Sequence, residues 1–200
     1  MARDYKMRKR AEARDLTRER ILQATMQLHD EQGVAPTTMA DIAKRAGVGQ
    51  ATVSRHFPSV SNLVQACGMH VWVEMQPPVP DAAPAVFAGI DTTQARLVRL
   101  VEELDSFYGR GALRLGLAGR DRDLLPELNG FLTAVEAGVE ALVREALALA
   151  GEPERAVQVA IMLMSFPAWS GFNRLGLPAS ELTDLKVRIL ECGIKAARQI

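Results

Sequence analysis

Polar side chains gather in one short stretch of this sequence, residues 50–57. The helical spacing places Val53 on one side of the stretch and its polar side chains on the other. The residues that we expect to face outward are Gln50, Thr52, Ser54, Arg55 and His56. Amide, hydroxyl and guanidinium groups recognise other molecules through hydrogen bonds, so the chemistry that this stretch favours is recognition.

The residues before this stretch are those needed to hold it at a steep angle to another helix. Thr38, with an acidic residue three positions later, has the capping-box pattern that begins a helix. Ala43 is small where two helices would cross, and Gly47 supplies the positive φ of a tight turn. Pro58 ends the second helix. Residues 38–57 thus predict a helix-turn-helix with a face for the DNA major groove, although an ordinary hairpin with a solvated face has the same spacing.

Composition favours an all-α protein, because Ala, Leu, Arg, Glu and Met are plentiful and aromatic residues make up only 5%. The 200-residue chain has no net charge, yet residues 1–60 hold 11 Lys and Arg against 7 Asp and Glu. The first 20 residues alone hold eight basic and four acidic side chains. Such a basic leading segment suits contact with a polyanion, and a solvated tail would have the same composition.

The periodicity of apolar residues predicts helices along most of the chain. Their approximate ranges are 17–33, 38–46, 50–57, 59–75, 92–108, 112–118, 126–150, 153–174 and 180–198. Thr17, Ser59 and Ser180 are the expected N-caps of three of them. A break is expected at Gly109–Gly111, and residues 76–90, with four prolines, predict a connector.

No motif of an enzyme, a metal site or a cofactor site is present in the sequence. The three histidines have no metal-ligand spacing, and there is no phosphate-binding loop or nucleophile elbow. Cys67 and Cys192 fit no disulfide framework or zinc site, which favours a reducing compartment. Without a secretory signal or a long apolar stretch, we expect a cytoplasmic protein that does not enter membranes.

Residues 17–66 resemble the tetracycline-repressor-like (TetR-type) family of bacterial regulators. The matching residues are Arg20-Ile21-Leu22, Thr38-Met39-Ala40-Asp41-Ile42-Ala43, Ala46-Gly47-Val48, Thr52-Val53, Arg55-His56-Phe57-Pro58-Ser59 and Leu63-Val64. The rest of the chain is similar only in length and helical character. The resemblance implies a homodimer that binds a palindromic operator in double-stranded DNA, acts as a repressor, and leaves the operator when a small molecule enters the C-terminal domain.

The same resemblance implies which residues contact DNA. They are Thr38, Lys44, Arg45, Gln50, Ala51, Thr52, Ser54, Arg55 and His56. Three positions depart from the family's pattern, since Ser54, Val60 and Gly49 stand where a tyrosine, a lysine and a serine are usual. These departures weaken the binding of phosphates, and the alternative function is a helical protein-interaction module with reduced or absent DNA binding. By our hypothesis, the basic segment at the N-terminus compensates for this weaker phosphate binding by reaching into an adjacent minor groove.

We therefore expect an all-α chain with a basic extension (1–16), a three-helix helix-turn-helix domain (17–60) and a larger helical ligand-binding and dimerisation domain (61–200). Candidate residues of a pocket for a hydrophobic or aromatic molecule are Trp72, Met75, Leu100, Leu104, Phe107, Tyr108, Leu115, Phe131, Val135 and Met162. Candidate dimer-interface residues are Ile161, Met164, Trp169, Phe172, Leu182, Leu185, Ile189 and Ile194. Apolar residues at helical spacing are also what an ordinary core contains.

Overall fold

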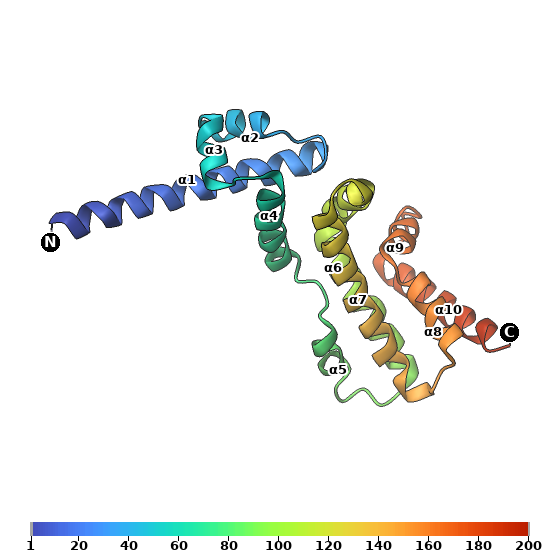
Figure 1. The fold of residues 1–200 in the computed structure, drawn as a ribbon. Coiled ribbons are helices and arrows are strands. Elements are labelled where there is room, and N and C mark those ends of the chain that lie inside the picture. Colours follow the sequence, from blue (N-terminus) through green and yellow to red (C-terminus); the bar gives the residue numbers. More distant parts are fainter. Residues whose placement is uncertain (1, 200) are drawn as a thin grey trace. The chain divides into compact units, whose positions relative to one another are not determined.

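The computed structural model describes the backbone of residues 2–199 and side chains from Tyr5 onward, and this part of the chain contains helices and no strand (Figure 1). The α-helices are α1 (Ala2–Gln32), α2 (Met39–Ala46), α3 (Gln50–His56), α4 (Val60–Met75), α5 (Ala83–Val86), α6 (Thr93–Asp121), α7 (Pro126–Leu147), α8 (Glu154–Leu163), α9 (Phe166–Asn173) and α10 (Ala179–Ala197). Short 3-10 turns cover Pro80–Ala82, Arg122–Leu124 and Ala148–Ala150. The all-α prediction is confirmed. Among these helices, none is both long enough and apolar enough to cross a bilayer.

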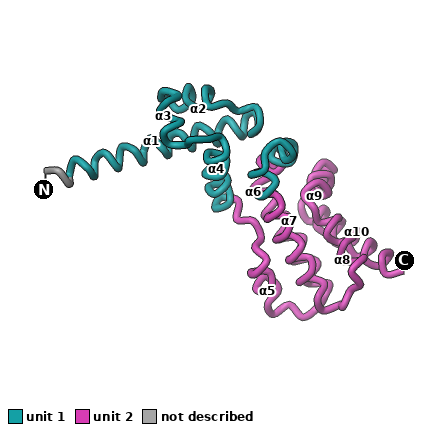
Figure 2. The backbone as a smooth tube through the Cα atoms, viewed as in Figure 1, with its two compact units in different colours: residues 1–74, 116–131 teal, residues 75–115, 132–200 magenta. Residues whose placement is uncertain are grey.

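The chain forms two compact units (Figure 2). The first consists of the chain up to residue 74 and residues 116–131, and the second consists of residues 75–115 and 132 onward. The first unit therefore holds α1, α2, α3 and nearly all of α4, together with the end of α6 and the start of α7.

A small apolar core holds α1, α2, α3 and α4 together in the first unit. Ile21, Val53 and Phe57 are at most 2% exposed and belong to one cluster of buried side chains. Burying a side chain of this size contributes about 1.5–3 kcal/mol. Because each short helix supplies only one to three buried residues, α2 and α3 keep their positions through this shared core.

Helix α1 begins at Ala2, so the predicted N-cap at Thr17 is wrong. The hydroxyl of Thr17 instead donates to the carbonyl oxygen of Ala13 at 2.8 Å, as threonines inside helices do. The preceding residues are mostly Ala, Arg, Lys and Glu, which favour helix, and Arg8 lies 3.6 Å from Glu12 one turn later. The basic segment thus continues the helix of the first unit.

Helix α6 runs without interruption through Gly109 and Gly111, so the predicted break there is wrong. Each glycine inside a helix costs about 1 kcal/mol relative to alanine, and burial of Tyr108 and Leu115 offsets that cost. A Cβ atom at Gly111 would collide with the side chain of Met75. Gly111 therefore leaves room for the end of the Met75 side chain where the two chain segments pack.

The C-terminal part of the second unit also differs from the prediction. The sequence predicts a single helix over residues 153–174, but α8 ends at Leu163 and α9 begins at Phe166. Pro167 lacks a backbone N–H and sits in the first turn of α9, which separates it from α8. The last helix begins at Ala179 after Pro178, so the expected N-cap at Ser180 is also wrong.

Candidate nucleic-acid interface

Helix α2 begins with the predicted capping box. The Thr38 hydroxyl oxygen accepts a hydrogen bond from the Asp41 N–H at 3.2 Å, and the Asp41 carboxylate accepts from the Thr38 N–H at 3.3 Å. The Thr38 hydroxyl also donates to the Asp41 carboxylate at 2.6 Å, and this bond, followed by the one from the Thr38 N–H, holds the pKa of Asp41 below its ordinary value. Two amide groups that would otherwise lack partners are satisfied, which fixes where α2 starts.

Helix α2 ends at Gly47, whose φ of 63° and ψ of 38° lie in the left-handed region. The Val48 N–H donates to the Ala43 carbonyl at 3.0 Å, and the Gly47 N–H donates to the Lys44 carbonyl at 3.3 Å. This bond pair is a Schellman motif, which reverses the chain within two residues. The predicted turn is confirmed, and it sets the direction in which α3 leaves α2.

Helix α3 buries one residue and exposes most of the others. Val53 is inaccessible to solvent, whereas Gln50, Ala51, Ser54 and Arg55 are exposed. The remaining two candidates on this helix, Thr52 and His56, are half-buried. Gly49 precedes the helix without a side-chain cap. The polar side of α3 is thus accessible over the two turns that would enter a major groove.

The candidate residues on α2 and at its start differ in their freedom to contact a phosphate. Thr38 and Lys44 are exposed, but the Arg45 guanidinium makes two hydrogen bonds to the Glu31 carboxylate, at 2.8 and 2.7 Å. This contact raises the pKa of Arg45 and lowers that of Glu31. Arg45 therefore joins α2 to α1, and Lys44 is the candidate cation of this helix that stays solvated.

Two further features of the helix-turn-helix and its surroundings were not predicted. The guanidinium of Arg18 lies 4.8 Å from the ring centre of Phe57, which places a cation from α1 beside the end of α3. The basic segment before it is helical, and a helix is about 10–12 Å across. Since the minor groove is about 6 Å wide, the hypothesis that this segment reaches into it does not fit the helical form.

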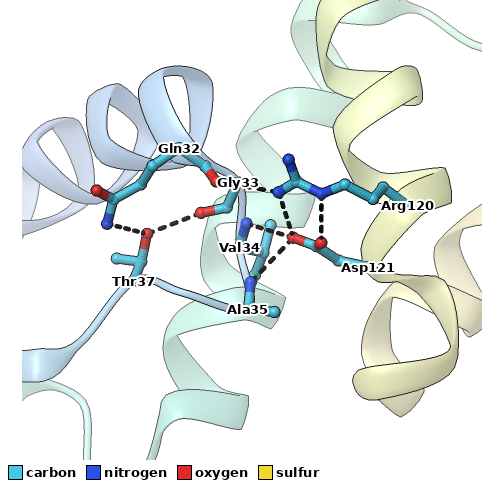
Figure 3. Close-up of polar contacts among 7 residues, drawn as sticks. All are labelled: Gln32, Gly33, Val34, Ala35, Thr37, Arg120 and Asp121. Atoms are coloured by element: carbon cyan, nitrogen blue, oxygen red, sulfur yellow. Dashed lines mark hydrogen bonds and ion pairs between the residues drawn. The ribbon is translucent and has the colours of Figure 1, made fainter.

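The loop between α1 and α2 is held by the end of α6, within the first unit (Figure 3). The Asp121 carboxylate accepts hydrogen bonds from the N–H groups of Val34, at 2.9 Å, and Ala35, at 3.0 Å. Arg120 donates to the same carboxylate at 2.9 Å and to the Gln32 carbonyl at 3.0 Å. We refer to these five residues as the Asp121 cluster.

Asp121 is only 3% exposed, although it stands in a run of charged residues of the kind that is usually solvated. The bond from Arg120 lowers the pKa of Asp121 most, with smaller effects in the same direction from the two backbone N–H groups. The nearby His29 is mostly buried, and this lowers its pKa to about 4. The cluster fixes the loop that leads into the capping box of α2.

The predicted pocket residues divide between the two units. Met75, Leu100, Leu104, Phe107, Tyr108, Leu115 and Val135 are buried in the second unit. Trp72 and Phe131 lie in the first unit, where their rings meet edge to face at 5.5 Å. Met162 is 61% exposed and therefore lines no interior cavity. Whether any of the buried residues touches a ligand stays a prediction.

The predicted interface residues also fall into two groups. Met164, Leu182 and Ile194 are buried within the chain itself. Ile161, Trp169, Phe172, Leu185 and Ile189 are half-buried and keep some accessible surface. Their role in pairing two chains stays a prediction.

A buried polar group that the sequence did not reveal lies near Trp169. The Trp169 ring nitrogen donates to the Asp105 carboxylate at 2.8 Å, and the same oxygen pairs with the buried ammonium of Lys186. The Tyr108 hydroxyl donates to the Met164 carbonyl at 2.9 Å, and burial raises the pKa of that hydroxyl. These contacts join α6, α9 and α10 and give Trp169 a role within the second unit.

Known proteins resemble this chain first of all in the helix-turn-helix and the helices beside it. Residues 21–67 match the family model of bacterial regulatory proteins, tetR family. The HTH-type transcriptional regulator BetI of Burkholderia thailandensis is 34% identical over 58 residues, which are 29% of this chain and 30% of that relative. The match therefore spans less than a third of BetI.

Solved structures extend the likeness to most of the fold. A mutant of HlyIIR, covering 87% of this chain and 96% of that one, has a TM-score of 0.60 at 16% identity. A putative TetR-family transcriptional regulator from Mesorhizobium loti, covering 92% and 97%, has a TM-score of 0.57 at 20% identity. At these identities the likeness shows a shared fold. BetI and the Mesorhizobium loti protein are both described as transcriptional regulators.

Proposed function

We propose that this chain, whose N-terminal region belongs to the tetR family of bacterial regulatory proteins, is a cytoplasmic, sequence-specific DNA-binding transcriptional regulator. Residues on α2 and α3 contact the DNA, with Gln50, Ala51 and Thr52 nearest the bases. The chain acts as a homodimer on a palindromic operator, as a repressor, and a small molecule bound by the second unit releases it.

One observation carries this proposal. Helices α2 and α3 are fixed by a capping box, a Schellman turn at Gly47 and a shared core, yet the outer side of α3 takes no part in that core. A rigid helix with an accessible polar side is what base readout in the major groove requires. Gln50 can pair with an adenine edge through two hydrogen bonds, a contact worth about 1–3 kcal/mol of discrimination.

Gln50→Ala is expected to weaken binding to the specific site by about 5- to 150-fold, because alanine cannot form a base contact of this energy. The measurement is a gel-shift titration at fixed salt with duplex DNA from upstream of the protein's own gene, beside an unrelated duplex of equal length. The wild-type chain is expected to bind the upstream duplex at submicromolar concentration. Affinity for the unrelated duplex should stay unchanged, since phosphate contacts dominate it.

The matched control is Gln65→Ala, which changes an exposed glutamine on α4. Circular dichroism should show the same helix content in both variants. If the wild-type chain bound neither duplex, the proposal would give way to the alternative, a helical protein-interaction module. If Gln50→Ala bound the upstream duplex as tightly as the wild type, α3 would not be the reading helix.

Deleting residues 2–14 is expected to lower affinity for both duplexes about tenfold near physiological salt. The deleted segment carries six basic residues, Arg3, Lys6, Arg8, Lys9, Arg10 and Arg14. For every phosphate that the shortened chain no longer neutralises, the slope of log affinity against log salt should fall by about 0.9. Titrations at several salt concentrations give both quantities.

A full-length variant with those six residues changed to glutamine is the control for this deletion, because it removes the positive charges and keeps the chain length. The slope of log affinity against log salt should fall by the same amount in the deletion and in the glutamine variant. An unchanged dissociation constant at fixed salt would show that the basic segment does not contact DNA.

A further inference from the structure

The second unit contains a cavity of about 160 Å³ between residues 76–86 and the helices α6 and α7. Most of its wall is apolar. The apolar side chains that matter here are those of Pro78, Val79, Val86, Phe107 and Leu142. An apolar cavity of about 150 Å³ in another protein binds benzene, so this one has room for a single ring.

The wall formed by residues 76–86 is packed directly on the helices, although its four prolines predicted a loose connector. A Cβ atom at Gly138 of α7 would collide with the carbonyl oxygen of Pro78, and one at Gly111 of α6 would collide with Met75. Glycine at position 138 lets the Pro78 carbonyl approach the α7 backbone directly, and glycine at position 111 leaves room for the end of the Met75 side chain. The cavity is thus a fixed feature of the second unit.

Two charged side chains line the cavity, and they differ in their partners. Glu103 pairs with Arg99 on the same helix. Arg110 donates to the neutral oxygens of Met75, at 3.0 Å, Gln76, at 3.3 Å, and the Ser106 hydroxyl, at 2.6 Å. These three partners are uncharged, so the positive charge of Arg110 can still pair with an anion.

The spacing of these groups fits a molecule with an apolar body and one anionic end. Glu103, Phe107 and Arg110 are on one face of α6, since they are four and three residues apart. Because the Glu103 carboxylate is paired with Arg99, its repulsion of an anion beside Arg110 is reduced.

We propose that this cavity binds a small carboxylate with a single aromatic or aliphatic ring. The ring packs on Phe107, Pro78 and Leu142, and the carboxylate receives hydrogen bonds from Arg110 at the cavity mouth. This assignment names the chemical class of the effector and, for its regulatory meaning only, rests on the proposed function.

The contact also supplies a route for regulation along the chain. Arg110 bonds to the carbonyls of Met75, the last residue of α4, and Gln76, whose φ of 47° is the one positive value of a non-glycine residue between residues 2 and 199. A carboxylate competes with these carbonyls for the guanidinium. Ligand binding therefore loosens the peptide at which α4 ends.

The test compares three ligands of equal size with different charge, 3-phenylpropanoate, 3-phenylpropan-1-ol and 3-phenylpropan-1-amine. Calorimetric titration of the full chain is expected to give about tenfold tighter binding of the carboxylate than of the alcohol, with the amine weakest. Arg110→Gln should remove the preference for the carboxylate and leave binding of the alcohol unchanged. Val79→Trp, at a wall position that is 46% exposed, should weaken all three ligands by obstructing the cavity.

The control variant is Arg188→Gln, which removes an exposed charge from α10. The proposal is overturned if the alcohol or the amine binds as tightly as the carboxylate, if Arg110→Gln keeps the preference, or if Val79→Trp binds all three like the wild type. Because the titration contains no DNA, its outcome is independent of operator binding. A chain that binds the carboxylate and no DNA would contradict only the proposed function.

Discussion

Gly47→Val is expected to abolish specific DNA binding, with at least a hundredfold loss of affinity, and to lower the free energy of unfolding by about 2 kcal/mol. Gly47 has a φ of 63°, a conformation that costs an L-residue about 1–2 kcal/mol and a β-branched residue more. No atom lies within 4 Å of a Cβ built at this position, so the effect isolates backbone conformation from crowding. Urea denaturation followed by circular dichroism and gel-shift titration measure the two effects.

Two further variants, one at Gly49 and one at Gly47, test whether the left-handed conformation of Gly47 is what the fold requires. Gly49→Ala places a methyl group in open space at a φ of −72°, which any residue adopts, and should change stability by less than about 0.5 kcal/mol. Gly47→Asn should retain most of the binding, because asparagine tolerates the left-handed region better than valine does. Equal binding by Gly47→Val and the wild type would show that the Schellman turn does not set the direction of α3.

The start and end of α2 could be predicted from the sequence because the signals act locally. Thr38 satisfies an amide group three residues away, and Gly47 forms its bond pair with residues within the same turn. Pro58 stops α3 through its own missing N–H. None of these effects depends on the rest of the chain, so a single sequence was sufficient to place the helix-turn-helix.

The Asp121 cluster could not be predicted, because its partners are far apart in the sequence. Asp121 and Val34 are separated by 87 residues, and an aspartate next to an arginine usually marks a solvated surface. The continuity of α6 was missed for a related reason. Its two glycines oppose helix locally, and the packing that overrides them involves Met75, 36 residues before Gly111.

Apolar spacing also could not separate core from cavity in the second unit. Leu100 and Leu104 have the same helical spacing as Phe107, yet of these three only Phe107 lines the cavity beside residues 76–86, and Leu100 is fully buried. Much of that cavity's wall comes from residues 76–86, which the sequence indicated as a connector. Because backbone groups and proline rings follow no helical spacing of apolar residues, such a wall cannot be predicted from that spacing.

Asp121→Ala is expected to lower the free energy of unfolding by about 2–3 kcal/mol at pH 7. The change removes a buried carboxylate that accepts from Arg120, Val34 and Ala35, and hydrogen bonds to a charged group contribute about 1.5–3 kcal/mol. Urea denaturation provides the measurement. Asp123→Ala is the matched control, because Asp123 is two residues away and exposed, and it should leave the unfolding curve unchanged.

The pH dependence of the free energy of unfolding distinguishes the contribution of the Asp121 charge from that of its packing. Its pKa is lowered in the folded chain, so its contribution is full above the ordinary value of 3.8 and is lost as the pH falls through the folded pKa. The stability difference between the wild type and Asp121→Ala should therefore shrink below pH 3.8. Asp121→Asn, which keeps one acceptor oxygen, should lose less stability than Asp121→Ala and show no such pH dependence. A constant difference from pH 7 to pH 3 would mean that the loop before α2 is held by shape alone, without help from the carboxylate charge.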